Sequence, residues 1–418
     1  MKKVLIMSAS TGGGHNRAAK AIQEELELKT INGEEIECKI IDSLKLINNF
    51  TDKLISRGYE KSAMYTPEAY GSIYRLSDTE LVSKNEYKDN PLASLLARKL
   101  KVLIKNEEPD LIIGTHPFPM ISLCKLKKMS NDKKLAENSN TESEEFSSYF
   151  HWSEDPIEIP PLISILTDYT VHSTHIQNEI DYYIVGHEYV KELLVSEGAP
   201  SEKIKPYGIP VEKSFLLHRD RETILKELNL LPDKKIIVLM GGSFGAGNIK
   251  ETLDELLEID RDFQILVITG RNKTLKEKID RRLATTEHNK NVQVLGFTDK
   301  MNDILYASDL IVTKPGGLTT TETLLKGIPM IVPYYIPGQE EENLDFLSNC
   351  GAVIRVTKKY TLSVLVKVLL DYPERVELLK KNINSIKKVN SAQNIANLSQ
   401  EIMENEDFIK KQNEKEHN

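Results

Sequence analysis

The sequence contains little cysteine and no long apolar run, and both features exclude classes of protein. Its three cysteines, Cys38, Cys124 and Cys350, lie too far apart in 418 residues for a disulfide framework or a zinc cluster. We expect them to be free thiols in a reducing compartment. No stretch approaches the roughly 18 apolar residues that a membrane span requires, and no signal peptide is recognisable. The sequence therefore predicts a cytoplasmic protein whose contact with a membrane is peripheral.

An excess of basic residues is also missing. The formal net charge is -8 and the pI is about 5.8, so we expect no nucleic-acid partner. The composition, with 40% hydrophobic and 28% charged residues, is typical of a soluble globular chain. Its length predicts two or three domains.

Short apolar runs without polar alternation recur along the chain, which is typical of buried parallel strands. KVLIMSAS, PDLIIGTHP and PPLISILTDYT lie in the first half, and DKKIIVLMGG and SDLIVTKPGG in the second. Helical patterns separate them, so we predict a doubly wound α/β sheet in each half. We expect an N-terminal domain at 1–208, a C-terminal domain at 209–385 and a helical tail at 386–418. The polar segment 127–160 predicts a surface insertion in the first domain.

Glycines follow strands directly at three places. The segments are TGGGH at 11–15, GGSFGAGN at 241–248 and KPGGLTTTETLLKG at 314–327. The first is a poor dinucleotide fingerprint, because Arg17 stands where the third glycine or alanine belongs, and no Walker lysine follows the first or second loop. Exposed backbone N–H groups at a helix start suit a phosphate or a hydroxyl group instead.

The third loop adds side chains that suit a nucleotide and a sugar. Residues 319–321 are threonines that predict a helix cap, with Glu322 in the first turn. A carboxylate there either compensates the helix dipole or accepts both hydroxyls of a ribose. Gln339 and Glu340, in the next loop, suit the hydroxyls of a sugar or simply begin a solvated helix.

At these motifs the sequence resembles glycosyltransferase family 28. TGGGH, GGSFGA and KPGGLTTTETLLKGIPMIV with IPGQEEEN look like the branch of plant monogalactosyldiacylglycerol synthases and bacterial diacylglycerol glucosyltransferases. LTDYTVHSTH, DYYIVGHEYVKELL and IKPYGIPV also match, so the resemblance covers nearly the whole chain. It implies a GT-B fold, in which two Rossmann-like doubly wound α/β domains face each other across a cleft. The C-terminal domain would bind the UDP-sugar and the N-terminal domain the acceptor.

The resemblance also implies roles for individual residues. His15 would face the reacting centre, which makes it the candidate general base. Independently of the resemblance, His116 and Asp168 end strands at the same expected rim, so either could assist or replace it. The alternative for His116 is a structural histidine. The diphosphate would lie at the glycine loops beside Arg271, the uracil at Phe297, the ribose at Glu322 and the sugar at Gln339 and Glu340. The complete set of expected donor-binding residues is Gly13, Gly14, Gly242, Ser243, Gly245, Arg271, Phe297, Gly316, Gly317, Thr319, Glu322, Gln339 and Glu340.

The expected reaction inverts the anomeric carbon. An imidazole with an ordinary pKa of about 6.5 suits the removal of a proton from an alcohol at neutral pH. The alcohol then attacks the anomeric carbon and UDP leaves. Helix N-termini and Arg271 would offset the charge that develops on the diphosphate, so we expect no metal ion and no further cofactor.

Residues 43–76 mix aliphatic, tyrosine and basic side chains. Leu46, Phe50 and Leu54 recur near helical spacing, and Lys53 and Arg57 add positive charge. Such a stretch, at about 46–61, could lie on an anionic membrane surface. The alternative is an ordinary helix that packs its apolar stripe into the core.

The sequence thus predicts an inverting, UDP-sugar-dependent glycosyltransferase that acts on diacylglycerol or a glycosyl-diacylglycerol. One alternative is a UDP-GlcNAc-type transferase with a polyprenyl-linked or other amphiphilic acceptor. Another is a nucleotide-sugar sensor without turnover, and a more distant one is a nicotinamide-dependent oxidoreductase. The sequence defines neither the donor sugar nor the oligomeric state.

Overall fold

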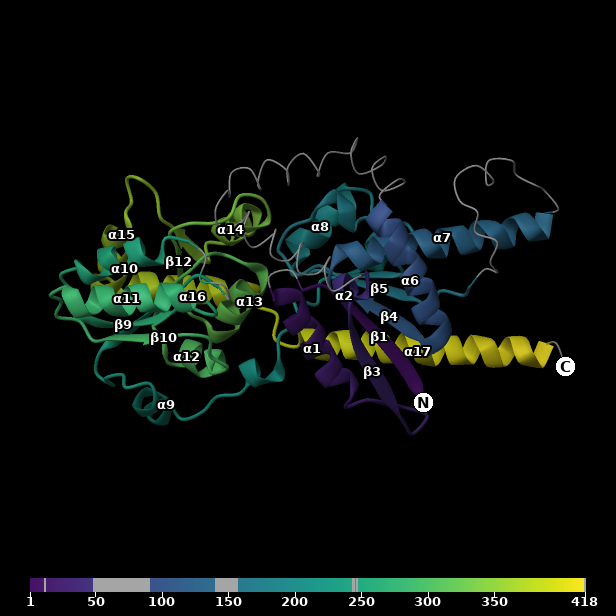
Figure 1. Cartoon of the computed structure of the whole chain (residues 1–418), viewed down its shortest axis with the longest axis horizontal. Coiled ribbons are helices and arrows are strands. Elements are labelled where there is room, and N and C mark those ends of the chain that lie inside the picture. The colour runs from purple at the N-terminus through teal and green to yellow at the C-terminus, as the bar shows by residue number, and fades with distance from the viewer. Residues whose placement is uncertain (11–12, 48–90, 140–156, 243–244, 246, 417–418) are drawn as a thin grey trace.

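The computed structural model describes residues 1–10, 13–47, 91–139, 157–242, 245 and 247–416. Within these ranges the chain forms two α/β domains that lie side by side (Figure 1), each built on its own sheet. This arrangement confirms the predicted fold class. No helix in these ranges is long and apolar enough to cross a membrane.

The sheet of the first domain has seven strands among the described residues, in the order β2-β3-β1-β4-β5-β6-β7. All neighbours are parallel except β2 and β3, which form a short antiparallel pair. The strands are β1 (Lys2–Ser8), β2 (Thr30–Ile31), β3 (Glu34–Asp42), β4 (Leu111–Gly114), β5 (Leu162–Ile165), β6 (Tyr182–Ile184) and β7 (Ile204–Lys205). The helices that accompany them are α1 (Gly14–Leu26), α2 (Ser43–Ile47), α6 (Pro91–Glu107), α7 (Pro117–Ser139) and α8 (Glu188–Ser196).

The second domain contains a six-stranded parallel sheet within the described residues, in the order β10-β9-β8-β11-β12-β13. Its strands are β8 (Lys235–Met240), β9 (Phe263–Ile268), β10 (Val292–Leu295), β11 (Leu310–Val312), β12 (Met330–Val332) and β13 (Val353–Arg355). Its helices are α9 (Arg221–Glu227), α10 (Ile249–Leu257), α11 (Lys273–Thr285), α12 (Met301–Ala307), α13 (Gly317–Lys326), α14 (Gln339–Asn349), α15 (Leu362–Asp371) and α16 (Pro373–Ile386).

The apolar runs in the sequence become central strands because helices cover both faces of each sheet. All four residues of β4 and of β5 are buried, as are five of the six in β8. Helix α1 contributes one apolar face, on which Ala18, Ile22 and Leu26 are buried. Glycine loops follow β1, β8 and β11, so they lie at the carboxyl ends of parallel strands, where such sheets bind ligands.

The predicted insertion is helical at its start. Helix α7 continues without interruption to Ser139, so residues 127–139 are helical. Four of these thirteen residues are lysines, and Met129, Leu135, Ala136 and Glu137 are also good helix formers, so a helix is favoured even though the overall composition is polar. The rest of the insertion up to residue 156, and residues 48–61 of the amphipathic segment, lie outside the described residues. The start of that segment is helical, since α2 covers Ser43–Ile47.

The last helix, α17 (Ser391–Glu416), returns to the first domain. Figure 1 shows it, in yellow, running along that domain after the chain has left α16 in the second. It contacts α1, and Ile395, Ala396 and Met403 are buried with the strands of the first sheet. The tail therefore completes the apolar core of the first domain.

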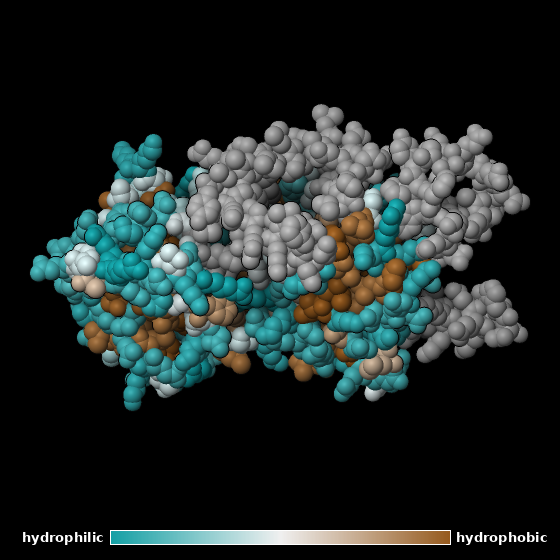
Figure 2. All heavy atoms as spheres, viewed as in Figure 1, coloured by the Kyte–Doolittle hydropathy of each residue, from teal (hydrophilic) through white to brown (hydrophobic). Residues whose placement is uncertain are grey.

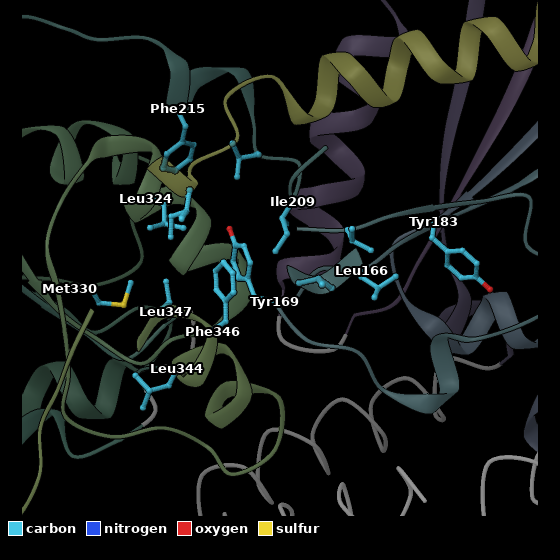
Figure 3. Packing of buried hydrophobic residues seen from close by; sticks show 14 of the residues in the cluster. Leu166, Tyr169, Tyr183, Ile209, Phe215, Leu324, Met330, Leu344, Phe346 and Leu347 are labelled. Atoms are coloured by element: carbon cyan, nitrogen blue, oxygen red, sulfur yellow. The ribbon is translucent and has the colours of Figure 1, made fainter. Parts of the chain in front are cut away.

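A single apolar cluster continues from one domain into the other. It contains Leu166 and Tyr169 after β5, and Leu324 and Phe346 from the second domain. Figure 3 shows the ring of Tyr169 lying against Phe346, and the two rings stack with centroids 4.6 Å apart. The carboxyl ends of the two sheets consequently meet in this structure.

Candidate active site

His15 lies at the start of α1, immediately after the first glycine loop. Gly13 precedes the helix with a φ of 80°, a left-handed conformation that favours glycine. The Nδ1 atom of His15 is 2.7 Å from the carbonyl oxygen of Thr115 and 3.0 Å from the hydroxyl of Thr167. Because a carbonyl oxygen only accepts, Nδ1 carries the hydrogen. The lone pair is then on Nε2, the nitrogen that can accept a proton.

The surroundings keep His15 neutral. Burial lowers the pKa of His15, although the nearby Asp168 carboxylate and the hydrogen bond to Thr115 partly oppose this. A neutral imidazole is the form that a general base requires. The position and the protonation state therefore fit the predicted role.

His116 lies next to His15 and also bonds to the backbone at the start of α7. The two rings meet edge to face with centroids 4.6 Å apart. The Nδ1 atom of His116 accepts a hydrogen bond of 3.1 Å from the backbone N–H of Phe118, at the start of α7. Burial, and then the neighbouring His15 and His175, hold the pKa of His116 well below its ordinary value. One ring nitrogen is thus engaged by the backbone of a helix start.

Asp168 is held by a buried asparagine of the other domain. The side-chain amide of Asn343 donates to Asp168 Oδ1 at 2.8 Å and to the carbonyl of Pro315 at 3.0 Å. Its oxygen accepts the backbone N–H of Tyr169 at 2.7 Å. Asn343 therefore joins the segment after β5 to the loop after β11. Burial raises the pKa of Asp168, and the bonds from Asn343 and the Gly317 backbone N–H act against the rise.

The N-terminus of α13 directly faces Thr167 and Asp168. A Cβ atom added to Gly317 would lie 1.9 Å from the carbonyl oxygen of Thr167 and 2.8 Å from Asp168 Oδ1. Only glycine permits this approach. A Cβ on Gly14 would be 3.8 Å from that of Leu318, so the first turns of α1 and α13 also lie close together. The two glycine loops therefore meet between the domains.

The predicted cap of α13 is wrong. The helix begins at Gly317 with Gly316 at the N-cap, so Thr319 and its neighbours lie inside it. The hydroxyl of Thr321 instead donates to the carbonyl of Gly317 at 2.8 Å. Glu322 is accordingly in the second turn and not in the first. The glycine pair moves the helix start toward the strand, which the threonine pattern did not reveal.

Glu322 is 2% exposed and is paired with Arg17 of the first domain. Burial raises the pKa of Glu322 to about 7, although Arg17 opposes the shift. Arg17 also lies 3.4 Å from Glu212. Arg17, which breaks the dinucleotide fingerprint, therefore forms an ion pair with Glu322, the carboxylate expected to bind ribose.

The remaining polar residues of this region belong to the loop before α14. Gly338, with a φ of 106°, precedes Gln339 at the helix start. Glu340 is buried, forms an ion pair with Lys314 and accepts the backbone N–H of Ile336 at 3.0 Å. Gln339 and Glu340 thus lie at the rim that also carries Asn343.

The second glycine loop adjoins the third. A Cβ on Gly242 would lie 3.0 Å from Cε of Lys314, and Gly242 has a φ of 71°. A Cβ on Gly245 would lie 2.7 Å from the carbonyl oxygen of Thr269, so this position also requires glycine. Ser243 lies outside the described residues.

Arg271 and Phe297 form a separate pair at the ends of β9 and β10. The guanidinium carbon of Arg271 is 5.1 Å from the centre of the Phe297 ring, which is 64% exposed. An aromatic ring with one open face suits the stacking of a base. Both residues lie on the same rim as the glycine loops, at some remove from His15.

Sequence reasoning did not identify Arg17, Asn343 or Lys314 as functional. Asn343 could have been identified from the sequence, because it ends the IPGQEEEN motif and buried amides normally have hydrogen-bond partners. The contacts of Arg17 depend on how the domains meet, for which the sequence carries no signal. Among the described residues there is no group of three or more His, Cys, Asp or Glu side chains placed to hold a metal ion.

Comparison with known families assigns both halves of the chain. Residues 15–136 and 145–211 match the monogalactosyldiacylglycerol (MGDG) synthase family. Residues 236–402 match the glycosyltransferase family 28 C-terminal domain.

Curated relatives match along nearly the full length. A processive diacylglycerol beta-glucosyltransferase of Bacillus pumilus is 29% identical over 409 residues, with 98% of this chain and 96% of the relative covered. The enzymes of the same name from Bacillus licheniformis and Bacillus subtilis are 29% and 28% identical over 393 residues, covering 94% of this chain and 93% of each relative.

Solved structures confirm the GT-B fold. Acinetobacter baumannii MurG superimposes with a TM-score of 0.56 at 15% identity, over 96% of this chain and 100% of its own. The UDP-GlcNAc 2-epimerase of Neisseria meningitidis, bound to UDP-GlcNAc, gives 0.55 at 15% identity, over 95% and 99%. Because the two family matches together span most of the sequence, this chain belongs to glycosyltransferase family 28, in the branch of monogalactosyldiacylglycerol synthases and bacterial diacylglycerol glucosyltransferases.

Proposed function

We propose that this chain transfers a hexose from a UDP-sugar to diacylglycerol, with inversion, to make a membrane glycolipid. The observation that carries the proposal is the placement of His15. Burial favours the neutral form of its ring, Thr115 holds its Nδ1, and it contacts the same Thr167–Asp168 segment that faces the N-terminus of α13. The names of the curated relatives support diacylglycerol as the acceptor and glucose as the hexose.

The chemistry follows from this arrangement. The acceptor hydroxyl loses its proton to His15 Nε2 while its oxygen attacks the anomeric carbon. The bond from that carbon to the diphosphate oxygen breaks, and UDP leaves with both electrons. The amides at the start of α13 and the glycine turns near Lys314 are placed to receive the diphosphate charge. Asp168, beside the imidazole, favours the imidazolium that forms.

The donor-binding roles are part of the same proposal. Phe297 would stack on the uracil, Glu322 would accept the ribose hydroxyls, and Gln339 and Glu340 would bind the sugar. Their common rim supports this, since all follow strands or begin helices at the carboxyl edge of the second sheet. Neighbouring structures of the same fold hold UDP-GlcNAc or UDP, according to their descriptions.

The acceptor requires contact with a membrane surface, and α6 offers a suitable face. Leu95 and Val102 are 41% and 58% exposed, and Lys99 and Lys105 are exposed on the same helix. Figure 2 shows an apolar patch over α6. Apolar side chains flanked by lysines are typical of helices that rest on anionic lipids. The contact predicted for residues 46–61 falls largely outside the described residues and stays a prediction.

The deciding experiment is transfer by His15→Ala. Purified protein is incubated with several UDP-sugars and diacylglycerol in detergent micelles, and the lipid is analysed by mass spectrometry. We expect His15→Ala to lose about 100-fold or more in turnover, the usual contribution of a general base, while UDP affinity by calorimetry is retained. His288→Ala, a histidine remote from the cleft, is the control.

The alternatives give different results in the same assay. A wild-type protein that binds UDP but modifies no lipid would be a nucleotide-sugar sensor. A protein that modifies a polyprenyl-linked acceptor and ignores diacylglycerol would belong to the other transferase class. Either result contradicts the proposal.

A further inference from the structure

The side chain of Asn343 is fully buried where the two domains meet. It lies in α14 of the second domain. One turn further along this helix, Phe346 stacks on Tyr169 of the first domain, with ring centroids 4.6 Å apart (Figure 3). An asparagine is rarely buried to this degree unless its hydrogen-bonding groups have partners. None of the roles proposed above uses this side chain.

The amide of Asn343 has a partner on both its nitrogen and its oxygen. The nitrogen donates to Asp168 Oδ1 at 2.8 Å and to the carbonyl of Pro315 at 3.0 Å, and the oxygen accepts the backbone N–H of Tyr169 at 2.7 Å. Because a carbonyl can only accept and a backbone N–H can only donate, these partners fix the orientation of the amide. Two of the three partners belong to the first domain. Asn343 therefore holds them only when the domains are docked.

The bond from Asn343 favours the charged form of Asp168. Burial raises the pKa of Asp168, and this bond is the largest of the influences that oppose the rise. Burial likewise lowers the pKa of His15, and the Asp168 carboxylate is the largest of the influences that raise it. An ionised carboxylate beside an imidazole makes the imidazole a stronger base. Asn343 therefore acts on His15 through Asp168.

The other titratable groups around His15 contribute little charge. His116 follows β4, and His175 lies between β5 and β6. Burial, together with neighbouring histidines, holds the pKa of His116 well below its ordinary value and lowers the pKa of His175 to about 4. Both rings are consequently neutral near pH 7. On α1 itself, the charge of Arg17 is compensated by the ion pair with Glu322 of α13.

Asp168 also faces a second carboxylate, that of Glu340 on α14, which raises the pKa of Asp168. Lys314 forms an ion pair with Glu340 and so compensates its charge. The charge that the Asn343 amide controls in this region is therefore that of Asp168.

We propose that Asn343 is a positioning residue, which fixes Asp168 beside His15 and thereby sets the strength of the base in the docked form of the protein. This inference rests on the proposed function, which makes His15 the base. When the acceptor hydroxyl gives its proton to His15 Nε2, Asp168 balances the charge of the imidazolium. Without the amide bond, Asp168 is more readily protonated and the base is weaker. Because Asn343 belongs to the other domain, domain docking and base strength are coupled.

The test follows the protonation of His15 by nuclear magnetic resonance, in the full chain with isotope-labelled histidine. The variant His15→Gln identifies the His15 signals among those of the nine histidines. Asp168→Asn keeps the shape of the side chain but removes its charge, and it should lower the pH at which His15 titrates by about one unit. Asn343→Ala should lower it by a smaller amount, since Asp168 is still present but more often neutral.

A double variant separates this role from a structural one. In the Asp168→Asn background, Asn343→Ala should lower the titration of His15 no further, because its effect passes through the Asp168 carboxylate. A structural disturbance would shift the titration equally in both backgrounds. Asn349 is an exposed asparagine of the same helix, and Asn349→Ala is the matched control that should leave the titration unchanged.

Turnover supplies a second readout. In Asn343→Ala the acid limb of kcat should move to lower pH, since His15 stays neutral there, and the maximal rate should fall because the base is weaker. An unchanged titration of His15 in Asn343→Ala, or equal shifts in both backgrounds, would overturn the proposal. If Asn343→Ala does not fold, an unchanged titration in Asp168→Asn overturns it alone. Absence of lipid product from the wild type would instead contradict the proposed function, because the titration needs no transfer.

Discussion

Two of the groups proposed to surround the donor are paired with the chain's own polar groups. The Asp168 carboxylate lies at the N-terminus of α13, where burial raises its pKa and the bond from the backbone N–H of Gly317 partly opposes the rise. Arg17 crosses from the other domain to Glu322, the carboxylate assigned to ribose. In the proposed binding mode, a nucleotide brings its diphosphate near Asp168 and its ribose hydroxyls to Glu322. Both internal contacts would then be exchanged for contacts to the donor.

Removal of Arg17 tests that exchange. In Arg17→Ala the ribose would no longer compete with a guanidinium for Glu322, so we expect UDP to bind about fivefold more tightly. The size corresponds to about 1 kcal/mol, as is usual for a partly exposed ion pair. Titration calorimetry with UDP measures it directly.

Two further variants make this result specific. Lys20, one turn along α1, pairs with Glu212 at 3.3 Å and not with Glu322, so Lys20→Ala should leave UDP affinity unchanged. Glu322→Gln should weaken UDP binding if the carboxylate accepts both ribose hydroxyls. Weaker binding in Arg17→Ala would show that the arginine itself contacts the donor, contrary to the exchange described.

At the scale of elements, the start of α13 controls how closely the domains approach. The carbonyl oxygen of Thr167 occupies the place of a side chain at Gly317, as the 1.9 Å distance to an added Cβ shows. By contrast, a Cβ on Gly316 would find its nearest neighbours, Glu340 Oε1 and Lys314 Nζ, at 3.5 and 3.7 Å. A side chain therefore fits at Gly316 but not at Gly317.

The substitution Gly317→Ala should therefore hold the domains apart. The methyl group cannot fit unless α13 and the Thr167–Asp168 segment separate, which would also break the bond from Asn343 to Asp168. We expect a larger radius of gyration by small-angle X-ray scattering, while Gly316→Ala keeps the wild-type value. If Gly317→Ala remained as compact as the wild type, the close approach would not govern closure.

The sequence predicted the elements better than the contacts between them. Buried strands such as β1 and β8 appear in the sequence as continuous apolar runs, and the glycine loops that follow them mark the carboxyl edge of each sheet. The start of α13 was misjudged, because the preference of threonine for helix caps is a weak local signal that context overrides. The Arg17–Glu322 and Asn343–Asp168 pairs join residues more than 150 positions apart. Only the docking of two domains creates them, so no local pattern could reveal them.

At the scale of the whole molecule, the chain passes between the domains twice, and the two passages touch. The hydroxyl of Ser391 donates to the carbonyl of Tyr207 at 2.8 Å. Gly208 has a φ of 98°, and a Cβ there would lie 2.4 Å from that of Lys388. The two crossings are therefore packed directly against each other at the point where the chain links the domains.

Because α17 follows the second crossing, it couples the stability of the first domain to the far end of the chain. Ile395 is fully buried against the first sheet, whereas Glu401 on the same helix is exposed. Ile395→Ala should lower the free energy of unfolding of the first domain by about 2–4 kcal/mol, through lost burial and a residual cavity. Hydrogen exchange should quicken in peptides from β1 and α1 and remain slow in β8 and β9, and Glu401→Ala should change neither. Equal acceleration in both sheets would mean that the domains unfold as one unit, and that α17 belongs to their common core.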